Sequence, residues 1–344
     1  MKFLVIRRDN IGDLVCTTPL IQTLREYYPD AQIDVLANSY NAPVLNEHPA
    51  INSVYSYTKS KHRRHDQSVL SLHINRLKLL FKLRQQHYDY ALIGYSSFCK
   101  FGYRLANWIN PKHILGFELP IKKARNVQMR SPSGNWHEVR KTFHLLTALK
   151  IPNSPPPLNL FPKQSLQDAL KKQWPNSPII IGLQISARKP KQRWSLESFK
   201  EFMEEILKQI DCSFMLFWSP GSSDNKHHPG DDLRAHDLIS LCPHLPLFPV
   251  FTNKVEDLTA GFSLCDYIVT SDGGAMHIAC GLNKPILCFF AGPHYKSWYP
   301  WKTNYILING NQTVNNISAQ TAADGLVELI KSKNQPISKI LQCH

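Results

Sequence analysis

Short apolar runs alternate with helical patterns through the first part of the chain. An apolar run of four or more residues between polar turns is typical of a parallel strand that is buried on both faces. Runs of this kind predict strands at 2–6, 32–37 and 89–95. Apolar residues at helical spacing predict helices at 19–28, 68–86 and about 137–149. The Tyr28-Pro29 step closes the first of these helices, because proline disfavours helical backbone in the residue before it.

A proline-rich segment interrupts this alternation. Residues 151–164 contain five prolines and no helical period, which is typical of a domain linker. After it the pattern predicts strands at 178–185, 213–219, 266–271 and 285–291. It also predicts helices at 195–209, 231–241, 255–264, 275–282 and 318–333. Two successive βα halves favour an α/β protein with two Rossmann-like domains, whose parallel sheets we expect to face a central cleft.

Charge is distributed unevenly over the 344 residues, whose length suits two domains. Residues 1–160 hold 22 Lys and Arg against 10 Asp and Glu, a net charge of +12. Residues 161–344 hold 18 against 16, a net charge of +2. The basic excess is densest at 59–87 and indicates an anionic partner: nucleic acid, a membrane surface or an acidic substrate. A solvated helix face explains any single lysine equally well.

Targeting and redox signals are weak. No apolar run reaches the ~18 residues that span a bilayer. The apolar stretch at the N-terminus lasts four residues and ends in charges, unlike a signal peptide. We therefore expect the protein in the cytoplasm. None of the eight cysteines forms a C-x-x-C pair, so we expect buried, reduced thiols.

The first candidate site is the loop 7–13, between the first strand and its helix. Gly12 allows the backbone to approach a ligand closely, and Asp13 stands where the helix begins. Asp13 is either a helix cap or a functional carboxylate, and its position alone does not decide between the two. The loop lacks the GK[ST] of a P-loop and the G-x-G-x-x-G of a dinucleotide site.

The second candidate site is the loop 184–194, which also follows a predicted strand. It combines one serine with four cations ahead of a helix that begins near residue 195: Ser186, Arg188, Lys189, Lys191 and Arg193. Cations beside a helix N-terminus suit a diphosphate, although a solvated basic loop has the same composition.

The third candidate site is the loop 271–277. Gly273 and Gly274 would expose backbone N–H groups at a helix start, as phosphate sites do. Asp272 precedes them, and His277 falls on the first turn of the helix. A single histidine there is more often packed than catalytic, but the cluster at one strand end favours a site.

Two long stretches resemble glycosyltransferase family 9, the lipopolysaccharide heptosyltransferases. FLVIRRDNIGDLVCTTPLIQTLREYYPDAQIDVLAN is similar to the family's opening, and CDYIVTSDGGAMHIACGLNKPILCFFAGPHYKSWYPW is similar to its donor motif. The resemblance covers nearly the whole chain. It implies a GT-B fold and inverting, metal-independent transfer of L-glycero-D-manno-heptose from ADP-heptose, without a cofactor. The implied acceptor is the lipid A-linked inner core of lipopolysaccharide.

The resemblance also implies roles for individual residues. Asp13 matches the catalytic base. The donor would be bound by Ser186, Arg188, Lys191, Arg193, Asp272, Gly273, Gly274 and His277. We expect the acceptor at Asn10, Gly12, Arg63 and Arg64. Gly273 stands where the family usually has Thr, and Gln192 where it commonly has Lys, so we expect Lys191 or Arg193 to supply that charge.

The expected domains are an acceptor domain at 1–160, a nucleotide-sugar domain at 161–320, and a tail at 321–344 that packs back on the first domain. Asp9 is the reserve candidate for the base. The basic segment would hold the enzyme peripherally at the cytoplasmic surface of the inner membrane.

Three alternatives stay open. The first is a family member with another nucleotide sugar or core position. The second is a basic nucleic-acid- or membrane-binding protein without transferase activity. We expect no nucleic-acid partner, because no recognition module accompanies the charge. The third is a Rossmann oxidoreductase, which the missing glycine fingerprint disfavours.

Overall fold

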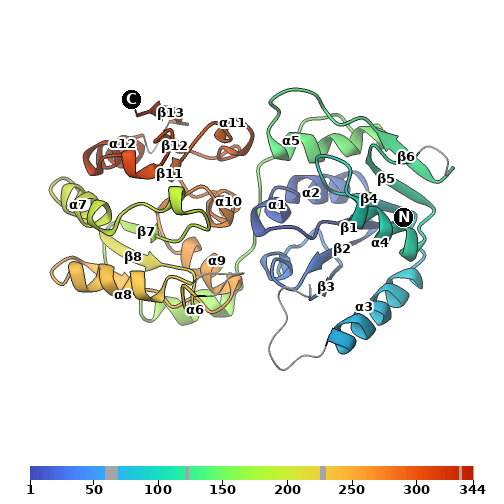
Figure 1. Ribbon diagram of the computed structural model, residues 1–344, viewed down its shortest axis with the longest axis horizontal. Coiled ribbons are helices and arrows are strands. Elements are labelled where there is room, and N and C mark those ends of the chain that lie inside the picture. The colour runs from blue at the N-terminus through green and yellow to red at the C-terminus, as the bar shows by residue number, and fades with distance from the viewer. Residues whose placement is uncertain (59–68, 121–123, 225–229, 333–334, 344) are drawn as a thin grey trace. The chain divides into compact units, whose positions relative to one another are not determined.

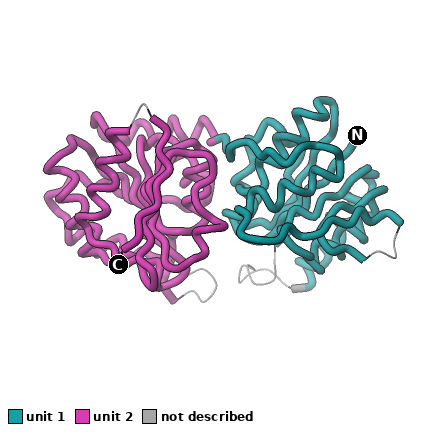
Figure 2. Tube along the Cα trace, turned by 90° about the horizontal axis from the view of Figure 1, so that it is seen from above, with its two compact units in different colours: residues 1–161 teal, residues 162–344 magenta. Residues whose placement is uncertain are grey.

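The computed structural model describes residues 1–58, 69–120, 124–224, 230–332 and 335–343. The chain forms two compact units, 1–161 and 162–344, which are coloured separately in Figure 2. The boundary between the units lies inside the proline-rich segment 151–164 and one residue from the expected boundary. The division of the chain into two units thus falls in the segment where the apolar pattern is interrupted by prolines.

The first unit contains a six-stranded parallel sheet in the order β3-β2-β1-β4-β5-β6. Its strands are β1 (Lys2–Ile6), β2 (Gln32–Asn38), β3 (Ser53–Tyr57), β4 (Tyr90–Ile93), β5 (His113–Phe117) and β6 (Asn126–Met129). The central pairs are in register, with Val5 opposite Val35 and Leu92. The strands predicted at 2–6, 32–37 and 89–95 are confirmed as β1, β2 and β4.

Helices cover both faces of this sheet (Figure 1). They are α1 (Ile11–Val15), α2 (Thr18–Tyr27), α3 (Val69–Arg84), α4 (Lys100–Ile109) and α5 (Glu138–Phe143), with 3-10 turns η1 (Ala42–Leu45) and η3 (His144–Leu149). Leu4 and Ile6 of β1 pack with Leu80, Leu83 and Leu105 on the α3–α4 side. Alternate residues of one strand thus supply both cores, which explains the continuous apolar run.

The second unit contains a seven-stranded parallel sheet in the order β13-β12-β11-β10-β7-β8-β9. Its strands are β7 (Ile180–Gln184), β8 (Ser213–Phe217), β9 (Leu247–Pro249), β10 (Tyr267–Ser271), β11 (Ile286–Phe290), β12 (Tyr305–Asn309) and β13 (Ser338–Gln342). The four strands predicted in this half are confirmed as β7, β8, β10 and β11. Both units are thus Rossmann-like α/β folds.

The α-helices described in the second unit include five that were predicted and two, at 164–171 and 295–298, that were not. They are α6 (Gln164–Lys171), α7 (Leu196–Leu207), α8 (Asp232–Leu241), α9 (Val255–Ser263), α10 (Gly274–Gly281), α11 (Tyr295–Trp298) and α12 (Ala319–Lys331), with the 3-10 turns η4 (Pro190–Gln192) and η5 (Val314–Asn316). Trp194 is 1% exposed and packs against Phe289 in the core beneath α7 and α12. Its indole N–H donates to the Ile317 carbonyl at 2.9 Å, which ties the loop after β7 to the start of α12.

The end of the chain belongs to the second unit. The expected boundary between 320 and 321 falls inside α12, which packs on α7, and β13 pairs with β12 as an edge strand. The tail is therefore part of the second Rossmann-like fold instead of a separate segment. Its packing on the first unit stays a prediction.

Each sheet changes winding direction at one place. In the first sheet this switch lies between β1 and β4, and in the second between β7 and β10. Ligands of open parallel sheets bind outside the carboxyl ends of the strands at such a switch. The loops after β1, β7 and β10 are the three candidate loops, so all three stand at switch points.

The cysteines are free thiols, and six of the eight are buried. Burial raises the pKa of Cys212 to about 12, together with the charge of Asp211. No helix within the described ranges is both long enough and apolar enough to cross a bilayer.

Candidate functional site

Two buried asparagines hold the loop that follows β1. Asn38 and Asn41 are both fully buried at the end of β2. The Asn38 side-chain amide donates to the carbonyls of Arg8 at 2.7 Å and Asp9 at 3.1 Å. The Asn41 amide donates to the Asn10 carbonyl at 3.2 Å. The loop backbone is therefore fixed by side chains from the neighbouring strand.

Arg7 organises the acidic side chains at this switch point. It is 1% exposed, and its Nε donates to Asp9 Oδ1 at 2.8 Å. Its Nη2 donates to Asp13 Oδ1 at 2.6 Å and to Glu138 Oε1 at 3.0 Å. Its Nη1 donates to the carbonyl of Gly94, directly after β4. One buried guanidinium thus connects the loop after β1, the end of β4 and the start of α5.

Asp13 caps a helix and also faces this cation. Its Oδ2 accepts from the backbone N–H of Asn10 at 3.2 Å and from the Asn10 side-chain amide at 2.7 Å. The contact to the Asn10 N–H is the reciprocal half of a capping box at the start of α1. The capping interpretation is therefore correct, and capping fixes the carboxylate without burying it, since 13% of its side chain is exposed.

The charge balance of this cluster shifts two pKa values. Burial alone would lower the pKa of Arg7, but Asp9, Asp13 and Glu138 raise it above its ordinary value. Burial raises the pKa of Asp9 to about 6; Arg7 acts against this shift, and the charge of Asp13 adds to it. Asp9 therefore exchanges its proton near neutral pH.

The expected acceptor residues fall into two groups. Asn10 and Gly12 lie in the cluster: Asn10 is exposed and bonded to Asp13, and Gly12 is buried in α1. Arg63 and Arg64 lie outside the described residues. Arg8, which the sequence did not single out, places its guanidinium carbon 3.8 Å from the centre of the Phe101 ring.

Asp272 is the centre of the switch point in the second unit. Its Oδ2 accepts from the Gln192 side-chain amide at 2.5 Å and lies 2.6 Å from His294 Nε2. Burial would raise its pKa, but His294, His277 and Gln192 hold it below the ordinary value. The loops after β7, β10 and β11 thus converge on one ionised carboxylate.

In the basic loop after β7, one cation is bound by other groups of the protein and three are exposed to solvent. Arg193 donates from Nε to the Ala187 carbonyl at 2.7 Å and pairs with Asp231 at 3.4 Å. Arg188, Lys189 and Lys191 are exposed. Of the two cations expected to replace the missing lysine at 192, Arg193 is thus held by the protein itself, whereas Lys191 faces solvent.

Ser186 anchors the beginning of the same loop. Its Oγ accepts from the Ser219 backbone N–H at 2.8 Å, which joins the ends of β7 and β8. The serine therefore shapes the loop, and its hydroxyl hydrogen can still be donated to a ligand.

The glycine pair begins α10 as predicted. Gly273 is the N-cap, with an extended φ of 165° that any residue can adopt. A Cβ added there would meet only the Ser271 carbonyl oxygen, at 4.0 Å. His277 is 2% exposed and packs edge-on against Trp298, with 5.7 Å between ring centres. His277 is therefore a packed group that supports the loop, and its charge acts on Asp272.

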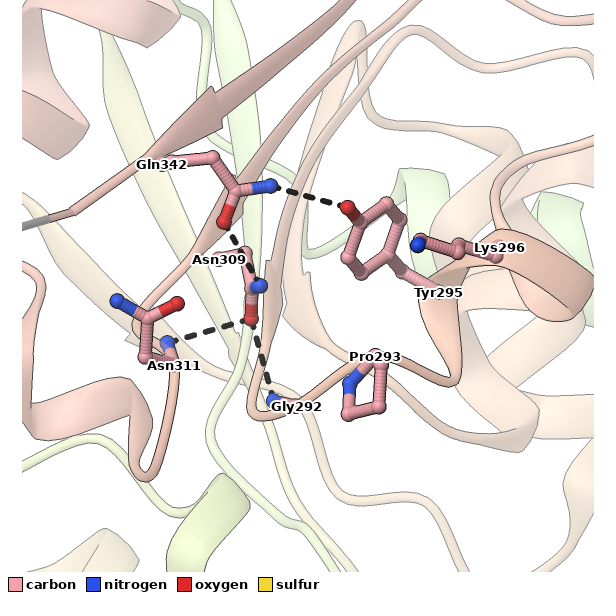
Figure 3. Close-up of a pocket in the computed structure, with 7 residues that line it drawn as sticks. All are labelled: Gly292, Pro293, Tyr295, Lys296, Asn309, Asn311 and Gln342. Carbon is pink, nitrogen blue, oxygen red and sulfur yellow. Dashed lines mark hydrogen bonds between the residues drawn. The ribbon is translucent and has the colours of Figure 1, made fainter.

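A pocket of about 380 Å³ lies at the segment that follows β11 and at the ends of β12 and β13 (Figure 3). It is lined by Gly292, Pro293, Tyr295, Lys296, Asn309, Asn311 and Gln342. Asn309 donates to Gln342 Oε1 at 2.9 Å, and Gln342 donates to the Tyr295 hydroxyl at 3.1 Å. These residues end β12 and β13 or follow β11, so the cavity continues the carboxyl edge from Asp272 toward the sheet margin.

Sequence reasoning missed three members of these clusters: Arg7, Glu138 and His294. Arg7 stands in the first candidate loop, and its place directly after a buried strand was the available signal. Glu138 is 131 positions from Arg7 and has only its place in the first turn of a predicted helix as a signal. His294 follows the strand predicted at 285–291, so the strand-end rule that selected the other loops would also have selected it.

Two Rossmann-like units with polar clusters at their switch points are the architecture of the GT-B fold. The model of glycosyltransferase family 9 (heptosyltransferase) matches residues 76–326, and the chain belongs to this family. It is 23% identical to lipopolysaccharide heptosyltransferase 3 of Escherichia coli over 86% of this chain and 85% of that protein. The relatives place the chain among heptosyltransferases of the lipopolysaccharide core.

Solved structures share the fold. The E. coli ADP-heptose LPS heptosyltransferase II has a TM-score of 0.77 at 20% identity, covering 97% of this chain and 99% of that one. The E. coli heptosyltransferase WaaC with ADP-2-deoxy-2-fluoro heptose has a TM-score of 0.72 at 14% identity, covering 95% and 99%. The expected GT-B fold is thereby confirmed.

Proposed function

We propose that this enzyme transfers L-glycero-D-manno-heptose from ADP-heptose to the lipid A-linked inner core, with inversion and without a metal ion. Asp13 is the base. The donor is supported by two solved proteins of the same fold, the E. coli ADP-heptose LPS heptosyltransferase II and the heptosyltransferase WaaC with ADP-2-deoxy-2-fluoro heptose. The observation that carries the mechanism is the geometry of the Asp13 carboxylate.

Asp13 keeps room for one more hydrogen bond. A carboxylate has about four acceptor positions on its two oxygens. The described residues fill three of them: Arg7 on Oδ1, and the backbone and side chain of Asn10 on Oδ2. The remaining position on Oδ1 suits an acceptor hydroxyl, because the carboxylate is fixed in direction and 13% exposed.

A single displacement accounts for inversion. The acceptor hydroxyl oxygen forms a bond to the anomeric carbon of the heptose. The bond between that carbon and the diphosphate oxygen breaks, and its electron pair leaves with ADP. The hydroxyl proton moves to Asp13 Oδ1. Arg7 keeps the carboxylate in position during this transfer, so it acts as a positioning residue.

The second unit holds the donor in this proposal. The first turn of α10 has N–H groups without helical partners, and these suit the diphosphate. Arg188 and Lys191 are exposed and can approach the same phosphates. Asp272 is held ionised by Gln192 and His294, so it can accept hydrogen bonds from hydroxyl groups of the donor.

The location is part of the proposal. We propose a cytoplasmic enzyme that associates peripherally with the inner membrane, where its lipid-linked acceptor lies. The net charge of +12 on residues 1–160 supports this location, since lysine and arginine near an acidic bilayer contribute about 1 kcal/mol each.

The test is Asp13→Asn in an assay of heptose transfer from ADP-heptose, together with donor binding by calorimetry. Asparagine has nearly the same shape but cannot take the proton. We expect kcat to fall by about a thousandfold or more while the donor Kd stays within about twofold. Near-normal turnover with intact donor binding would refute the role of Asp13.

A second candidate is transfer of another sugar from another nucleotide. It is favoured by the neutral Gln192 on Asp272 and by the open space at Gly273, both of which bear on how the donor is held. Comparing hydrolysis and transfer with ADP- and UDP-sugars separates the two candidates. Preference for a UDP-sugar would replace the donor and leave Asp13 as the base.

A further inference from the structure

Helix α3 carries a row of apolar side chains on its outer surface. Leu70 is 70% exposed, Ile74 42%, Leu77 52% and Phe81 63%. These four residues, the α3 stripe, follow one another at intervals of four, three and four residues. This spacing places them on one face of the helix. Single exposed apolar residues are ordinary, but a continuous row of four large ones marks an interaction surface.

The α3 stripe lies opposite the face that packs on the sheet. Leu80 is 6% exposed and Leu83 is fully buried, and both belong to the core of the first unit. At about 100° per residue, Leu80 points about 90° and Leu83 about 150° away from the centre of the stripe. The helix, labelled α3 in Figure 1, therefore has two apolar faces, and the described residues of its own unit cover the one that bears Leu80 and Leu83.

Basic residues border the stripe on both sides. Lys78 and Lys82 stand on one flank, and His73 and Arg84 on the other, and all four are exposed. Residues 69–84 contain no Asp or Glu. An apolar stripe between basic flanks is the composition of helices that lie in the interface of an anionic bilayer.

Charge also argues against two other occupants. A second copy of the chain would bring the cations of one α3 against those of the other, without carboxylates on this helix to offset them. Nucleic acid would use the cations but would leave four large aliphatic and aromatic side chains in water. A surface of anionic lipid satisfies both the apolar stripe and its basic flanks.

We infer that α3 is the membrane-docking element of this enzyme and lies in the plane of an anionic bilayer with the α3 stripe inserted among the lipids. From Leu70 to Phe81 the stripe extends over about 16 Å, at about 1.5 Å per residue. The inference rests on the proposed function, because docking on the bilayer brings the enzyme to a lipid-linked acceptor. It goes further in naming the side chains that bind the bilayer.

The experiment uses the full-length protein and vesicles of phosphatidylethanolamine with about one third phosphatidylglycerol, in a flotation assay. The test variant is Leu70→Ser, Ile74→Ser, Leu77→Ser and Phe81→Ser combined. The matched control is Leu233→Ser with Phe251→Ser, which are 70% and 74% exposed in the second unit. We expect the test variant to lose vesicle binding by about tenfold or more and the control to bind like wild type.

A second variant tests how much the basic flanks of the stripe contribute to vesicle binding. Lys78→Glu with Lys82→Glu should also weaken binding by about tenfold, because two cations become anions near an acidic surface. Phosphatidylcholine vesicles should bind the wild type weakly. Circular dichroism and thermal melting of every variant confirm that the fold is intact, so a loss of binding reports on the surface itself.

Three results would overturn the inference. The first is unchanged vesicle binding by a folded stripe variant. The second is a wild-type dimer that the stripe variant dissociates while vesicle binding stays the same. The third is tight DNA or RNA binding that the stripe variant retains without any binding to vesicles.

An assay of heptose transfer to a delipidated, soluble acceptor distinguishes two possible failures. One is that α3 does not dock on a bilayer, and the other is that the enzyme does not transfer heptose. The stripe variant should keep wild-type turnover on that acceptor and lose it on acceptor embedded in vesicles. Wild-type protein that binds vesicles through the stripe but transfers no heptose would refute the proposed function and leave the docking element standing.

Discussion

The buried guanidinium of Arg7 forms ion pairs with three carboxylates. Asp9, Asp13 and Glu138 all lie within 3.0 Å of its nitrogens. A buried cation without partners would be costly, so the three acids and Arg7 stabilise one another. The direction of the Asp13 carboxylate therefore depends on Arg7 and, through it, on Asp9 and Glu138.

Glu138→Gln tests this dependence. Glutamine keeps the shape of the side chain and can still accept one hydrogen bond from Arg7, but it removes one negative charge from the cluster. We expect kcat to fall by about tenfold, because Arg7 then shifts relative to Asp13, while the donor KM stays unchanged. Steady-state kinetics with varied donor measures both values.

The matched control is Glu328→Gln, which removes the partner of Lys339 in an exposed ion pair of the second unit. It should leave both kinetic values unchanged. A donor KM that rises in Glu138→Gln as much as kcat falls would instead place Glu138 in donor binding.

Asp9 gives the cluster a dependence on pH. Its pKa is about 6, above the ordinary 3.8, so between these values the native state holds a proton that the unfolded chain has lost. The unfolding free energy should therefore fall as pH rises through this window and level off above it. When Asp9 is protonated, its ion pair with Arg7 becomes a hydrogen bond between the cation and a neutral carboxylic acid, which loosens the hold on Arg7.

Activity should therefore rise with an inflection near pH 6, and Asp9→Asn should lack that inflection. The measurement is kcat/KM between about pH 5 and 8 for both proteins. An inflection that survives in Asp9→Asn would assign the titration to another group.

The residues of the site were predictable where they share one loop. Asp272 directly follows β10, and Asp13 stands in the first turn of the helix that the loop after β1 leads into, so the rule that ligands bind at strand ends selects both loops. Glu138 reaches Arg7 from a helix 131 positions away. Such a contact is set by how helices pack on the sheet, which apolar periodicity does not specify.

Among the elements, a strand is easiest to predict from the sequence when it is buried on both faces of the sheet, because its residues then form an apolar run. β7 and β8 are fully buried and appear as unbroken apolar runs. β3, β6 and β13 are edge strands with partly exposed residues, so their sequences SVYSY, NVQM and SKILQ lack such a run. β12 is fully buried, and its sequence YILIN did contain the signal.

The N-terminus of α10 offers a test at the scale of the element. Position 273 does not require glycine, because its backbone is extended and an added Cβ would meet only one atom, at 4.0 Å. Gly273→Thr should therefore fold normally and strengthen the helix cap, because threonine is a favoured N-cap. Its hydroxyl can add one hydrogen bond to the donor, which should lower the donor KM by about fivefold.

Thermal melting and donor-dependent kinetics measure the two effects. Gly273→Val is the matched control, since it has a similar shape without the hydroxyl and should not lower the donor KM. A rise in KM for both variants would mean that the donor itself occupies the space beside Gly273.

In the whole molecule, each unit carries one switch point with a hydrogen-bonded carboxylate at it, Asp13 in the first unit and Asp272 in the second. Asp13 belongs to the basic unit, and Asp272 to the nearly neutral unit. The proposed reaction thus divides base and acceptor from donor. Variants of the two units should therefore change different quantities. Asp13→Asn should lower kcat alone. Asp272→Asn should first weaken donor binding, because asparagine cannot replace the charge held by Gln192 and His294.

A mixture of these two variants tests whether one chain supplies both centres. Each variant keeps one intact unit, so chains that share their sites would regain activity when mixed. If Asp13 and Asp272 of the same chain serve one reaction, the mixture should show only the sum of the two residual rates at every protein concentration. The control is each variant mixed with wild type, which should give the wild-type rate in proportion to its amount. Activity above the sum, growing with concentration, would show that the base of one chain acts on the donor of another.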